Sequence, residues 1–519
     1  MAKYYDTILW EYIKNPWNRG LSLDDLALKY FEYKMISYDE VTNKKKLNFQ
    51  DVDLVDASIY SWEDVYVTWE LYKKQMEEEI VSGCHTKYTS EKPNQLSNKC
   101  ENQDFSILYN IEIPLLEVLK DMEIAWVKVD RDKLKWIGIL LENEIASLEK
   151  EIHNLAWEEF NIKSPRQVAD ILFTKLWLNS SKKTKTWFSV DSEVLEELAK
   201  KHDIAKKIID YRTYTKLLST YIEWLLWELD DDDIIHTNYN QTIASTWRLS
   251  STNPNLQNIP TWEWISWEIR TAFIPFSQDE IMLAFDYSQV EVRVLSIMSG
   301  DENLRNAFLN GIDIHYNTAK FMFATENITK DQRKIAKSVN FWVIYWISAF
   351  WLSKMIEGWV WECKKYIDKF YENYPKVREF FDKVVESCKE TWYVETLFWR
   401  KRYIAWINDS NRIIAESAKR EAINMPIQWT AADIIKLAMI EIHKFIKENN
   451  LKSKMIMQVH DELVFSVKKS EQEILEKNIK SIMENVLENS IKKWIIKNDI
   501  SLIPLLVDVW IWQNRWEAK

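Results

Sequence analysis

The sequence predicts an α/β (α+β) protein of several domains, in which helical segments flank a sheet whose strands carry acids at their ends. At 519 residues the chain is long enough for about three or four domains with a substantial core. Leucine and isoleucine recur at helical spacing from Ile111 to about Leu226, which predicts a long helical region. Farther along, two apolar runs of strand character lead directly into carboxylates, at Asp286 and Asp461. The chain therefore combines helical regions with at least one sheet.

Two stretches far apart in the chain carry these acids: AFDYSQVE at residues 284–291 and MQVHDELVF at residues 457–465. A single acid after an apolar run is usually an ordinary strand end. Strands with acids at their ends can also bring two carboxylates together, and facing carboxylates repel unless cations lie between them. Two divalent metal ions about 3.5–4 Å apart stabilise both the attacking and the leaving oxygen of an in-line phosphoryl displacement. The pair Asp286 and Asp461 is therefore a candidate site for phosphoryl transfer.

A third pattern lies between these stretches, where Arg333, Lys337, Phe341 and Tyr345 are spaced by four residues. On a helix each step of four drifts by only about 40°, so the four side chains share one sector of about 120°. That face offers two cations and then two aromatic rings. Spacing alone also fits an ordinary amphipathic helix with a basic end and a packed aromatic end. Together with the acids, it predicts a surface that binds a triphosphate and stacks on a sugar and base.

These three stretches, with TWRLSSTNPNLQN at residues 246–258 and NMPIQWTAAD at residues 424–433, resemble in order the motifs of the family A DNA polymerases, the bacterial DNA polymerase I group. The resemblance extends from about residue 107 to the C-terminus. It implies a right-hand polymerase with a helical thumb, helical fingers and an antiparallel-sheet palm.

Upstream, YSWED at residues 60–64 resembles the third motif of that family's RNase H-like 3′–5′ exonuclease domain. The two earlier acidic motifs of that domain do not precede Met1. Asp64 alone cannot assemble a two-metal hydrolytic site, so we expect an N-terminally truncated remnant of the exonuclease domain without proofreading.

The resemblance and the local composition divide the chain into six segments. They are a partial 3′–5′ exonuclease-like domain at 1–78, a linker at 79–106, the thumb at 107–235, the first part of the palm at 236–300, the fingers at 301–420 and the second part of the palm at 421–519. The linker is rich in Ser, Thr, Asn and Lys and has no apolar period. The tip of the thumb is expected at residues 161–188.

By resemblance, the catalytic centre consists of acids and one lysine, with two Mg²⁺ ions as cofactors. The implied metal ligands are Asp286, Asp461 and the backbone carbonyl of Tyr287. Glu462 would support the metal site, and Lys337 would donate a proton to the pyrophosphate leaving group.

The resemblance also implies a set of contacts to the incoming nucleotide. Arg333 and Lys337 would face its triphosphate, Phe341 would stack on its sugar and base, and Tyr345 would pack beside the new base pair. Phenylalanine rather than tyrosine at position 341 implies discrimination against dideoxynucleotides. The bulk of Glu291 would exclude a 2′-hydroxyl. His315 would contact the β-phosphate, although a structural histidine at a helix start is the alternative.

Residues expected to hold primer–template DNA fall into three groups. By resemblance, one group contacts the backbone and minor groove, a second surrounds the nascent pair, and lysines at the thumb tip meet duplex phosphates. Taken singly, each Asn or Gln is more often a surface or capping residue. Contacts to minor-groove acceptors suit an enzyme that must accept every correct pair, because that groove presents a degenerate pattern. The groups are Arg248, Asn255 and Gln257; Arg420, Asn424, Gln428 and His460; and Lys182, Lys183 and Lys185.

The formal net charge of −12 argues by itself against a nucleic-acid partner. Net charge is a poor guide when basic residues cluster, as they do in residues 163–185 and at Arg400, Lys401 and Arg402. Most such runs are solvated surface faces. The clusters therefore favour DNA binding only alongside the motifs.

The tryptophan and glycine contents are abnormal, with 28 Trp and 6 Gly. An ordinary chain of this length carries about 36 glycines, close to the 34 obtained by combining the two counts. Glycine serves where φ is positive or backbones approach closely, and tryptophan suits neither need. We hypothesise that UGA codons were translated as Trp where the source organism reads Gly; the alternative is a truly Trp-rich protein, and Trp516 is ambiguous. The family has glycine at the positions of Trp247, Trp342, Trp346, Trp351, Trp399 and Trp429.

Three other functions compete with a DNA-templated DNA polymerase. A 3′–5′ exonuclease is disfavoured by the incomplete set of N-terminal carboxylates. A single-subunit RNA polymerase shares the first Asp, the Lys–Tyr helix and the His-Asp pair, but Glu291 and Phe341 favour the DNA enzyme. A catalytically inactive DNA-binding remnant would follow only if the tryptophans are genuine.

Composition also bears on partners and location. The four cysteines have no zinc-ligand spacing, and no apolar run approaches the ~20 residues of a membrane span. We expect a cytoplasmic, nucleoid-associated monomer that binds primer–template DNA and deoxynucleoside triphosphates and does not associate with a membrane.

Overall fold

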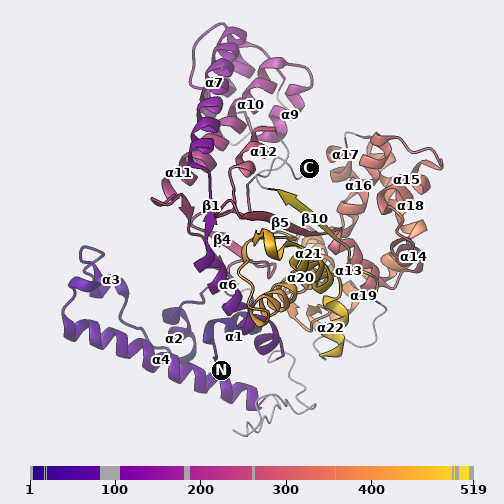
Figure 1. The fold of residues 1–519 in the computed structure, drawn as a ribbon. Helices are drawn as coiled ribbons and strands as arrows, with labels where there is room; N and C mark the ends of the chain where they lie inside the picture. The colour runs from indigo at the N-terminus through magenta and orange to yellow at the C-terminus, as the bar shows by residue number, and fades with distance from the viewer. Residues whose placement is uncertain are drawn as a thin grey trace.

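A four-stranded antiparallel sheet lies at the centre of the molecule, with helical regions on both sides of it (Figure 1). This arrangement is seen in a computed structural model that describes residues 4–16, 18, 20–81, 106–179, 188–259, 264–356, 358–493, 496 and 502–512. Most of these residues are helical, and the sheets are small and antiparallel. The predicted α/β (α+β) class is confirmed.

The central sheet has the strand order β10-β5-β9-β8 and joins segments far apart in the chain. Successive side chains of a strand point to opposite faces. Leu283 and Phe285 therefore pack with Leu463 and Phe465 into the larger core on one face, whereas Met282 and Ala284 contribute to a second core on the other. The strands are β5 (Glu280–Tyr287), β8 (Lys454–Val459), β9 (Glu462–Lys468) and β10 (Val507–Trp512).

The larger core is completed by a long helix, α20 (Arg412–Glu448), which contains Pro426. Its buried residues include Ile427, Ile434 and Ala438, so one side of the helix is apolar over several turns. Further helices, α21 (Gln472–Glu484) and α22 (Val486–Lys492), pack beside it. The core therefore fixes the sheet against residues 412–492.

The described residues between Ile111 and Leu226 are mostly helical, as the periodicity predicts. Helices α7, α9 and α10 stand together above the sheet in Figure 1, around a core that includes Ile152, Leu195 and Ile208. The elements of this region and of the two short strands around it are η2 (Leu108–Glu112), α6 (Ile113–Ala125), β1 (Val127–Lys128), α7 (Arg131–Ala156), α8 (Pro165–Ala169), η3 (Asp170–Lys175), α9 (Ser192–Ala199), α10 (Asp203–Leu217), η4 (Leu218–Glu223), α11 (Trp224–Glu228) and β2 (Ile234–Ile235).

Between β5 and α20 the chain forms a second helical region, on the right of the sheet in Figure 1. Two short hairpins and one helix complete the central part of the chain: β3 (Asn238–Asn240) with β4 (Ser250–Thr252), β6 (Tyr393–Glu395) with β7 (Lys401–Tyr403), and α12 (Trp264–Thr271). The helices of the second region are α13 (Val290–Ser299), α14 (Glu302–Leu309), α15 (Ile314–Phe323), α16 (Lys330–Ile344), α17 (Ala349–Met355), α18 (Val360–Asn373) and α19 (Pro375–Thr391).

Within the described residues of the N-terminal segment, from 4 to 81, all regular elements are helices joined by turns and loops, and none is a strand. Glu63, in the stretch that resembles an exonuclease motif, accepts hydrogen bonds from the Tyr33 hydroxyl (2.6 Å) and the Ile36 backbone N–H (2.7 Å). Those bonds give Glu63 a structural role. The helices are α1 (Thr7–Lys14), α2 (Leu23–Phe31), α3 (Tyr38–Val41), η1 (Phe49–Asp51) and α4 (Leu54–Val81).

A buried network of charges ties three distant segments together. Arg400 forms an ion pair with Glu112 and donates from Nε to both oxygens of Asp433, at 2.8 Å each. Lys436 lies 2.8 Å from Glu112. The arginine is only 1% exposed, so its prediction as part of a DNA-binding surface cluster is wrong. A buried guanidinium is retained because two carboxylates neutralise it.

Seven of the seventeen non-glycine residues with positive φ in the described ranges are tryptophans. Trp126, Trp157 and Trp392 follow the last turns of α6, α7 and α19, where glycine is the usual residue. Trp126 has φ 61° and ψ −172°, a region that only glycine normally occupies. The others are Trp177, Trp247, Trp346 and Trp399. Their backbone therefore has glycine geometry.

Two tryptophans at expected glycine positions, Trp247 and Trp429, are also unfavourably buried. Trp247 and Trp429 are fully buried, and their indole Nε1 atoms have no hydrogen-bond partner. A buried unpaired N–H costs about 1–3 kcal/mol. The packing here is therefore unfavourable for the indole N–H groups.

Several predicted features lie outside the described residues: Lys182, Lys183, Lys185, Trp516, Cys84, Cys100 and nearly all of the linker. Cys363 and Cys388 are buried and free. Of the helices in the described ranges, none is both long enough and apolar enough to cross a bilayer.

Candidate active site

The two acid-bearing stretches meet at one end of the central sheet. The Tyr287 backbone N–H donates to the carbonyl of Asp461 at 3.2 Å, so the turn between β8 and β9 lies against the end of β5. In the strand register Asp286 lies directly opposite Glu462. The structure therefore places the backbones of Asp286, Tyr287, Asp461 and Glu462 close together, and the pairing of the two carboxylates around metal ions stays a prediction.

Asp461 sits in an environment that disfavours its own charge. Burial raises the pKa of this carboxyl group, and the positive charge of Arg248 acts against that rise. Its Oδ1 atom is buried without a hydrogen-bond partner. A buried oxygen of this kind fits a cation ligand, because a bound cation would supply the missing partner and favour the ionised form.

The donor set favours a hard divalent ion. Two carboxylates and a backbone carbonyl are the oxygen ligands that Mg²⁺ accepts, whereas sulfur and imidazole ligands favour zinc or copper. Within the described ranges, no group of three or more Asp, Glu, His or Cys side chains is arranged to hold a metal ion. The oxygen atoms of Asp286, Asp461 and the Tyr287 carbonyl are of the chemical kind that fits Mg²⁺.

Sequence reasoning missed a further acid beside this site. Asp508 on β10 lies opposite Asp286, as Glu462 does on the other side, so three carboxylates form a row across β10, β5 and β9. Directly opposed like charges destabilise a sheet. Asp508 is the only polar residue in the strand at 507–512, and this was the available signal for it.

Glu291 joins two other predicted residues at the start of α13. Its carboxylate accepts from the Arg248 guanidinium at 2.7 Å and from the Tyr345 hydroxyl at 2.9 Å. Burial raises the pKa of Glu291, and the charge of Arg248 opposes this. The side chain is therefore fixed in place at the side of the acid site, since Arg248 also acts on Asp461.

The predicted helix at residues 333–345 is α16, with Tyr345 as its last, capping residue. Arg333, Lys337 and Phe341 are exposed and Tyr345 is half-buried, so the predicted face is open apart from its C-terminal end. Arg333 is already paired with Asp313, at 2.6 Å from Nη2 and 2.8 Å from Nε. A triphosphate would have to compete with that carboxylate.

His315 is buried between α15 and α16. Its Nδ1 atom lies 3.0 Å from the amide nitrogen of Asn340, a residue that the sequence reasoning did not single out. Burial lowers the pKa of His315 to about 4, with opposing contributions from Asp313 and from the charges of Arg333 and Lys337. The imidazole is therefore neutral at pH 7.

Two of the predicted minor-groove residues, Asn255 and Gln257, form hydrogen bonds within the chain. Gln257 is buried and donates to the Gln458 side chain at 2.7 Å, and Asn255 accepts from the Gln257 backbone at 3.0 Å. This pair therefore shapes the loop after β4 next to the acid-bearing turn.

A second set follows one face of α20. Arg420, Asn424 and Gln428 are spaced by four residues, so they point to the same side of the helix. Arg420 is exposed, and His460 lies exposed at the turn before Asp461. The Oδ1 atom of Asn424 is buried without a partner. Arg420, Asn424 and His460 therefore have polar groups available for a ligand, whereas the side chain of Gln428 forms a hydrogen bond with Tyr345.

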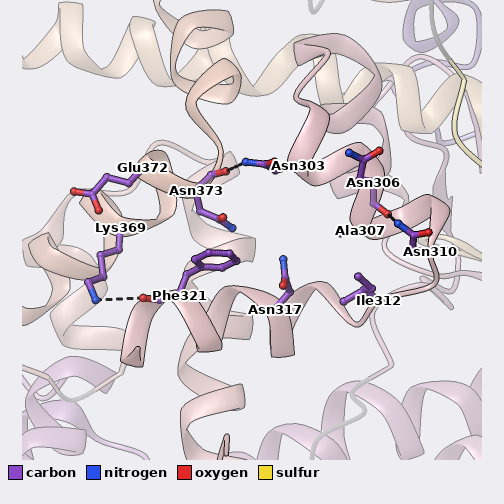
Figure 2. Close-up of a pocket in the computed structure, with 10 residues that line it drawn as sticks. All are labelled: Asn303, Asn306, Ala307, Asn310, Ile312, Asn317, Phe321, Lys369, Glu372 and Asn373. Atoms are coloured by element: carbon purple, nitrogen blue, oxygen red, sulfur yellow. Dashed lines mark hydrogen bonds between the residues drawn. The ribbon is translucent and has the colours of Figure 1, made fainter. Parts of the chain in front are cut away.

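A cavity of about 530 Å³ lies elsewhere, between α14, α15 and α18 (Figure 2). Asparagines line much of it, among them Asn303, Asn317 and Asn373, and Lys369 closes one side by donating to the Phe321 carbonyl at 3.2 Å. None of the predicted site residues lines this cavity. It is therefore separate from the acid site.

Comparisons with known proteins agree on one family. The model of DNA polymerase family A matches residues 131–516. DNA polymerase I of Caldicellulosiruptor bescii is 44% identical over 413 residues, covering 79% of this chain and 47% of that protein. DNA polymerase I of Bacillus subtilis is 41% identical over 488 residues, covering 93% and 53%. The chain thus spans about half the length of the curated relatives it matches.

The fold has a close match among solved structures. The POL domain of Pol1 from M. smegmatis, in complex with DNA primer-template and dNTP, superimposes with a TM-score of 0.83. That match has 29% sequence identity and covers 99% of this chain and 82% of the other.

Proposed function

Because this chain belongs to DNA polymerase family A, we propose that it adds deoxynucleotides to the 3′ end of a primer, copying a DNA template. The observation that carries the proposal is the contact between the end of β5 and the β8–β9 turn, which places Asp286 beside the segment that holds Asp461. Two acids brought together from distant segments, one with an unpaired buried oxygen, fit metal-assisted phosphoryl transfer.

Each residue has a role in this proposal. Asp286, Asp461 and the Tyr287 carbonyl would hold two Mg²⁺ ions, supported by Glu462. When bound, such an ion pair supplies stabilisation for the attacking and leaving oxygens of an in-line displacement. Lys337 protonates the pyrophosphate as it leaves. The chain is proposed to act as a monomer.

The remaining predicted residues bind the substrates. Arg333 leaves Asp313 to contact the triphosphate, Phe341 stacks on the nucleotide and Tyr345 packs beside the new pair. Arg248, Asn255, Gln257 and the exposed face of α20 hold the primer–template. The M. smegmatis structure was solved with DNA primer-template and dNTP bound, which supports these two substrates here.

Primer extension tests the proposal directly. The chain as printed and a chain with glycine at Trp247, Trp342, Trp346, Trp351, Trp399 and Trp429 are incubated with primer–template and Mg²⁺, with deoxynucleotides and ribonucleotides supplied separately. Extension with deoxynucleotides is expected, and chelation of the metal should abolish it. Extension with ribonucleotides alone would identify an RNA polymerase, primer shortening an exonuclease, and DNA binding without extension by either chain an inactive remnant.

We further propose that the abnormal tryptophans stand for glycines encoded by UGA. The support is conformational, since helix-capping and other positive-φ positions hold Trp126, Trp157, Trp346 and Trp399. Reading the codons at the 28 Trp positions settles the matter. Mass spectrometry of the native protein gives a second test, because indole masses at Trp342 and Trp429 would contradict the proposal.

One pair of substitutions on helix α7 tests the backbone argument alone. Trp157 caps the helix with φ 59° and is 86% exposed, whereas Trp136 lies within the helix and is 49% exposed. Trp157→Gly is expected to stabilise the protein by about 1 kcal/mol, because it relieves left-handed strain. Trp136→Gly should destabilise it by about 1 kcal/mol or more, because glycine weakens a helix interior. Urea unfolding curves measure both, and equal signs would contradict the argument.

The position of Glu291 leads to a prediction about sugar selection. Glu291→Ala is expected to raise ribonucleotide incorporation relative to deoxynucleotide by about a hundredfold, the upper range for steric exclusion of a small group. The ratio of kcat/KM for the two nucleotides measures it. Tyr345→Phe is the matched control, because it removes the 2.9 Å bond to Glu291 but keeps the carboxylate. Equal loss of selectivity in both variants would mean that the tyrosine, and not the bulk of Glu291, excludes the 2′-hydroxyl.

A further inference from the structure

Asn340 lies on the side of α16 that faces α15, with its side-chain nitrogen against two acceptors. The nitrogen is 3.0 Å from His315 Nδ1 and 3.4 Å from the carbonyl oxygen of Ile314. Asn340 is 1% exposed and His315 is 7% exposed. Water therefore has little access to this contact.

These two contacts fix the hydrogen positions. A backbone carbonyl can only accept, so the amide group that faces Ile314 must be the NH₂ rather than the oxygen. The same NH₂ faces His315 and can only donate, so Nδ1 of His315 must be the acceptor. In a neutral imidazole the proton then resides on Nε2. Among the described residues, Nε2 of His315 has no hydrogen-bond partner. It is also not one of the unpaired polar atoms that are fully buried, so it is accessible to solvent.

We propose that Asn340 is a positioning residue that holds His315 as the neutral Nε2–H tautomer, ready to donate a hydrogen bond to a phosphate oxygen of the incoming deoxynucleoside triphosphate. The inference rests on the proposed function for the identity of that ligand. The tautomer itself follows from Asn340 and Ile314 alone.

The surrounding charges agree with a neutral donor. Asp313, which caps the helix of His315, is paired with Arg333, and Arg333 and Lys337 add positive charge from α16. A third cation buried beside them would be costly. A neutral N–H offers a directed hydrogen bond to phosphate without that cost.

The structure also shows what this arrangement costs. The Oδ1 atom of Asn340 is buried and has no partner. A leucine of similar size would avoid an unsatisfied oxygen, which makes the side chain hard to explain by stability alone. A requirement for a donor to His315 accounts for it.

Two variants and a matched control test the proposal in the full-length protein. Asn340→Asp keeps the shape but replaces the donor with an acceptor, so Nδ1 of His315 must gain a proton. Asn340→Leu removes the donor without adding charge and guards against misfolding from a buried carboxylate. Asn310→Asp makes the same change in the same region at an exposed position, where the amide donates to the Asn306 carbonyl at 2.8 Å.

The first readout is independent of activity. In ¹⁵N-histidine-labelled protein, with the His315 signal assigned through His315→Gln, we expect the Nε2–H tautomer in the unaltered chain and in Asn310→Asp at pH 7.5. Asn340→Asp should give an Nδ1-protonated ring. An Nδ1–H or doubly protonated His315 in the unaltered chain would overturn the proposal.

The second readout is steady-state primer extension. Both Asn340 variants should raise the KM for deoxynucleotide by about tenfold, a typical effect of removing a residue that orients a histidine ligand. The kcat should change less than about threefold, because the contact is made in the ground state as well as the transition state. In Asn340→Asp, kcat/KM should gain a dependence on pH between about 6 and 8, where a His paired with a carboxylate titrates.

The outcomes separate the two levels of inference. An unchanged KM in both variants, with the tautomer as predicted, would overturn the positioning role while leaving the polymerase assignment intact. If the unaltered chain extends no primer, the proposed function is wrong, and so is the proposed contact between His315 and the phosphate. The NMR signal would still show which tautomer His315 adopts.

Discussion

Asp286→Ala is expected to lower the rate of primer extension by about a thousandfold or more, a loss of about 4 kcal/mol of transition-state stabilisation. The side chain lies at the end of β5, opposite Glu462 and next to the segment of Asp461. Removing it would leave Asp461 and a backbone carbonyl as the only protein ligands of the proposed metal site. Affinity for primer–template should be unchanged, because none of the proposed DNA contacts, which are Arg248, Asn255, Gln257 and one face of α20, lies on β5.

Two further variants make this test specific. Asp461→Asn, which keeps the shape of the side chain, should give a loss of similar size. Glu280→Gln is the control on the same strand, since Glu280 lies at the far end of β5 and bonds to Ser466 (2.6 Å) and Lys468 (2.8 Å). Single-turnover extension and a fluorescence anisotropy titration measure rate and affinity. Extension by Asp286→Ala at near-normal rate would remove the basis of the two-acid mechanism.

The parts of the site that could be predicted are those in which one short stretch carries the chemistry. Asp286 and Asp461 each end an apolar strand, and the four-residue spacing of Arg333 to Tyr345 defines one face of α16. Such signals are local, because strand and helix periodicity place side chains within a few residues. The fold class could be predicted from the same patterns.

The parts that could not be predicted depend on contacts between distant segments. Arg400 belongs to a basic triplet, and a charged run usually marks a solvated surface. Its burial against Glu112 and Asp433 is set by how η2, the β6–β7 turn and α20 meet. Asn340 was missed for the same reason, since only the packing of α15 on α16 gives it a function.

The tryptophans show a third limit on what could be predicted from the sequence. Composition and family comparison pointed to glycine at six positions, of which Trp247, Trp346 and Trp399 have positive φ. The structure adds Trp126, Trp157, Trp177 and Trp392, which lie outside the quoted motifs. Backbone conformation is therefore a broader indicator of positions suited to glycine than motif matching, because it needs no recognisable neighbours.

The buried network around Arg400 supports the prediction with the largest expected effect on stability. Arg400→Met should lower the free energy of unfolding by about 3–5 kcal/mol, the usual cost of leaving a buried charge without its partner. The substitution removes the only ion pair recorded for Asp433 in the described residues, whereas Glu112 keeps Lys436 at 2.8 Å and the Gln241 amide at 2.5 Å. Asp433 should therefore account for most of the loss.

A matched pair and a compensating variant separate this mechanism from a general loss of packing. Arg402→Met, two residues away, breaks a more exposed pair with Glu421 at 2.9 Å and should cost about 1 kcal/mol or less. Adding Asp433→Leu to Arg400→Met should recover much of the loss, because an apolar pair leaves no unpaired charge. Urea denaturation followed by circular dichroism measures all three. Equal shifts for Arg400→Met and Arg402→Met, or no recovery in the double variant, would show that the network is held by shape rather than by charge.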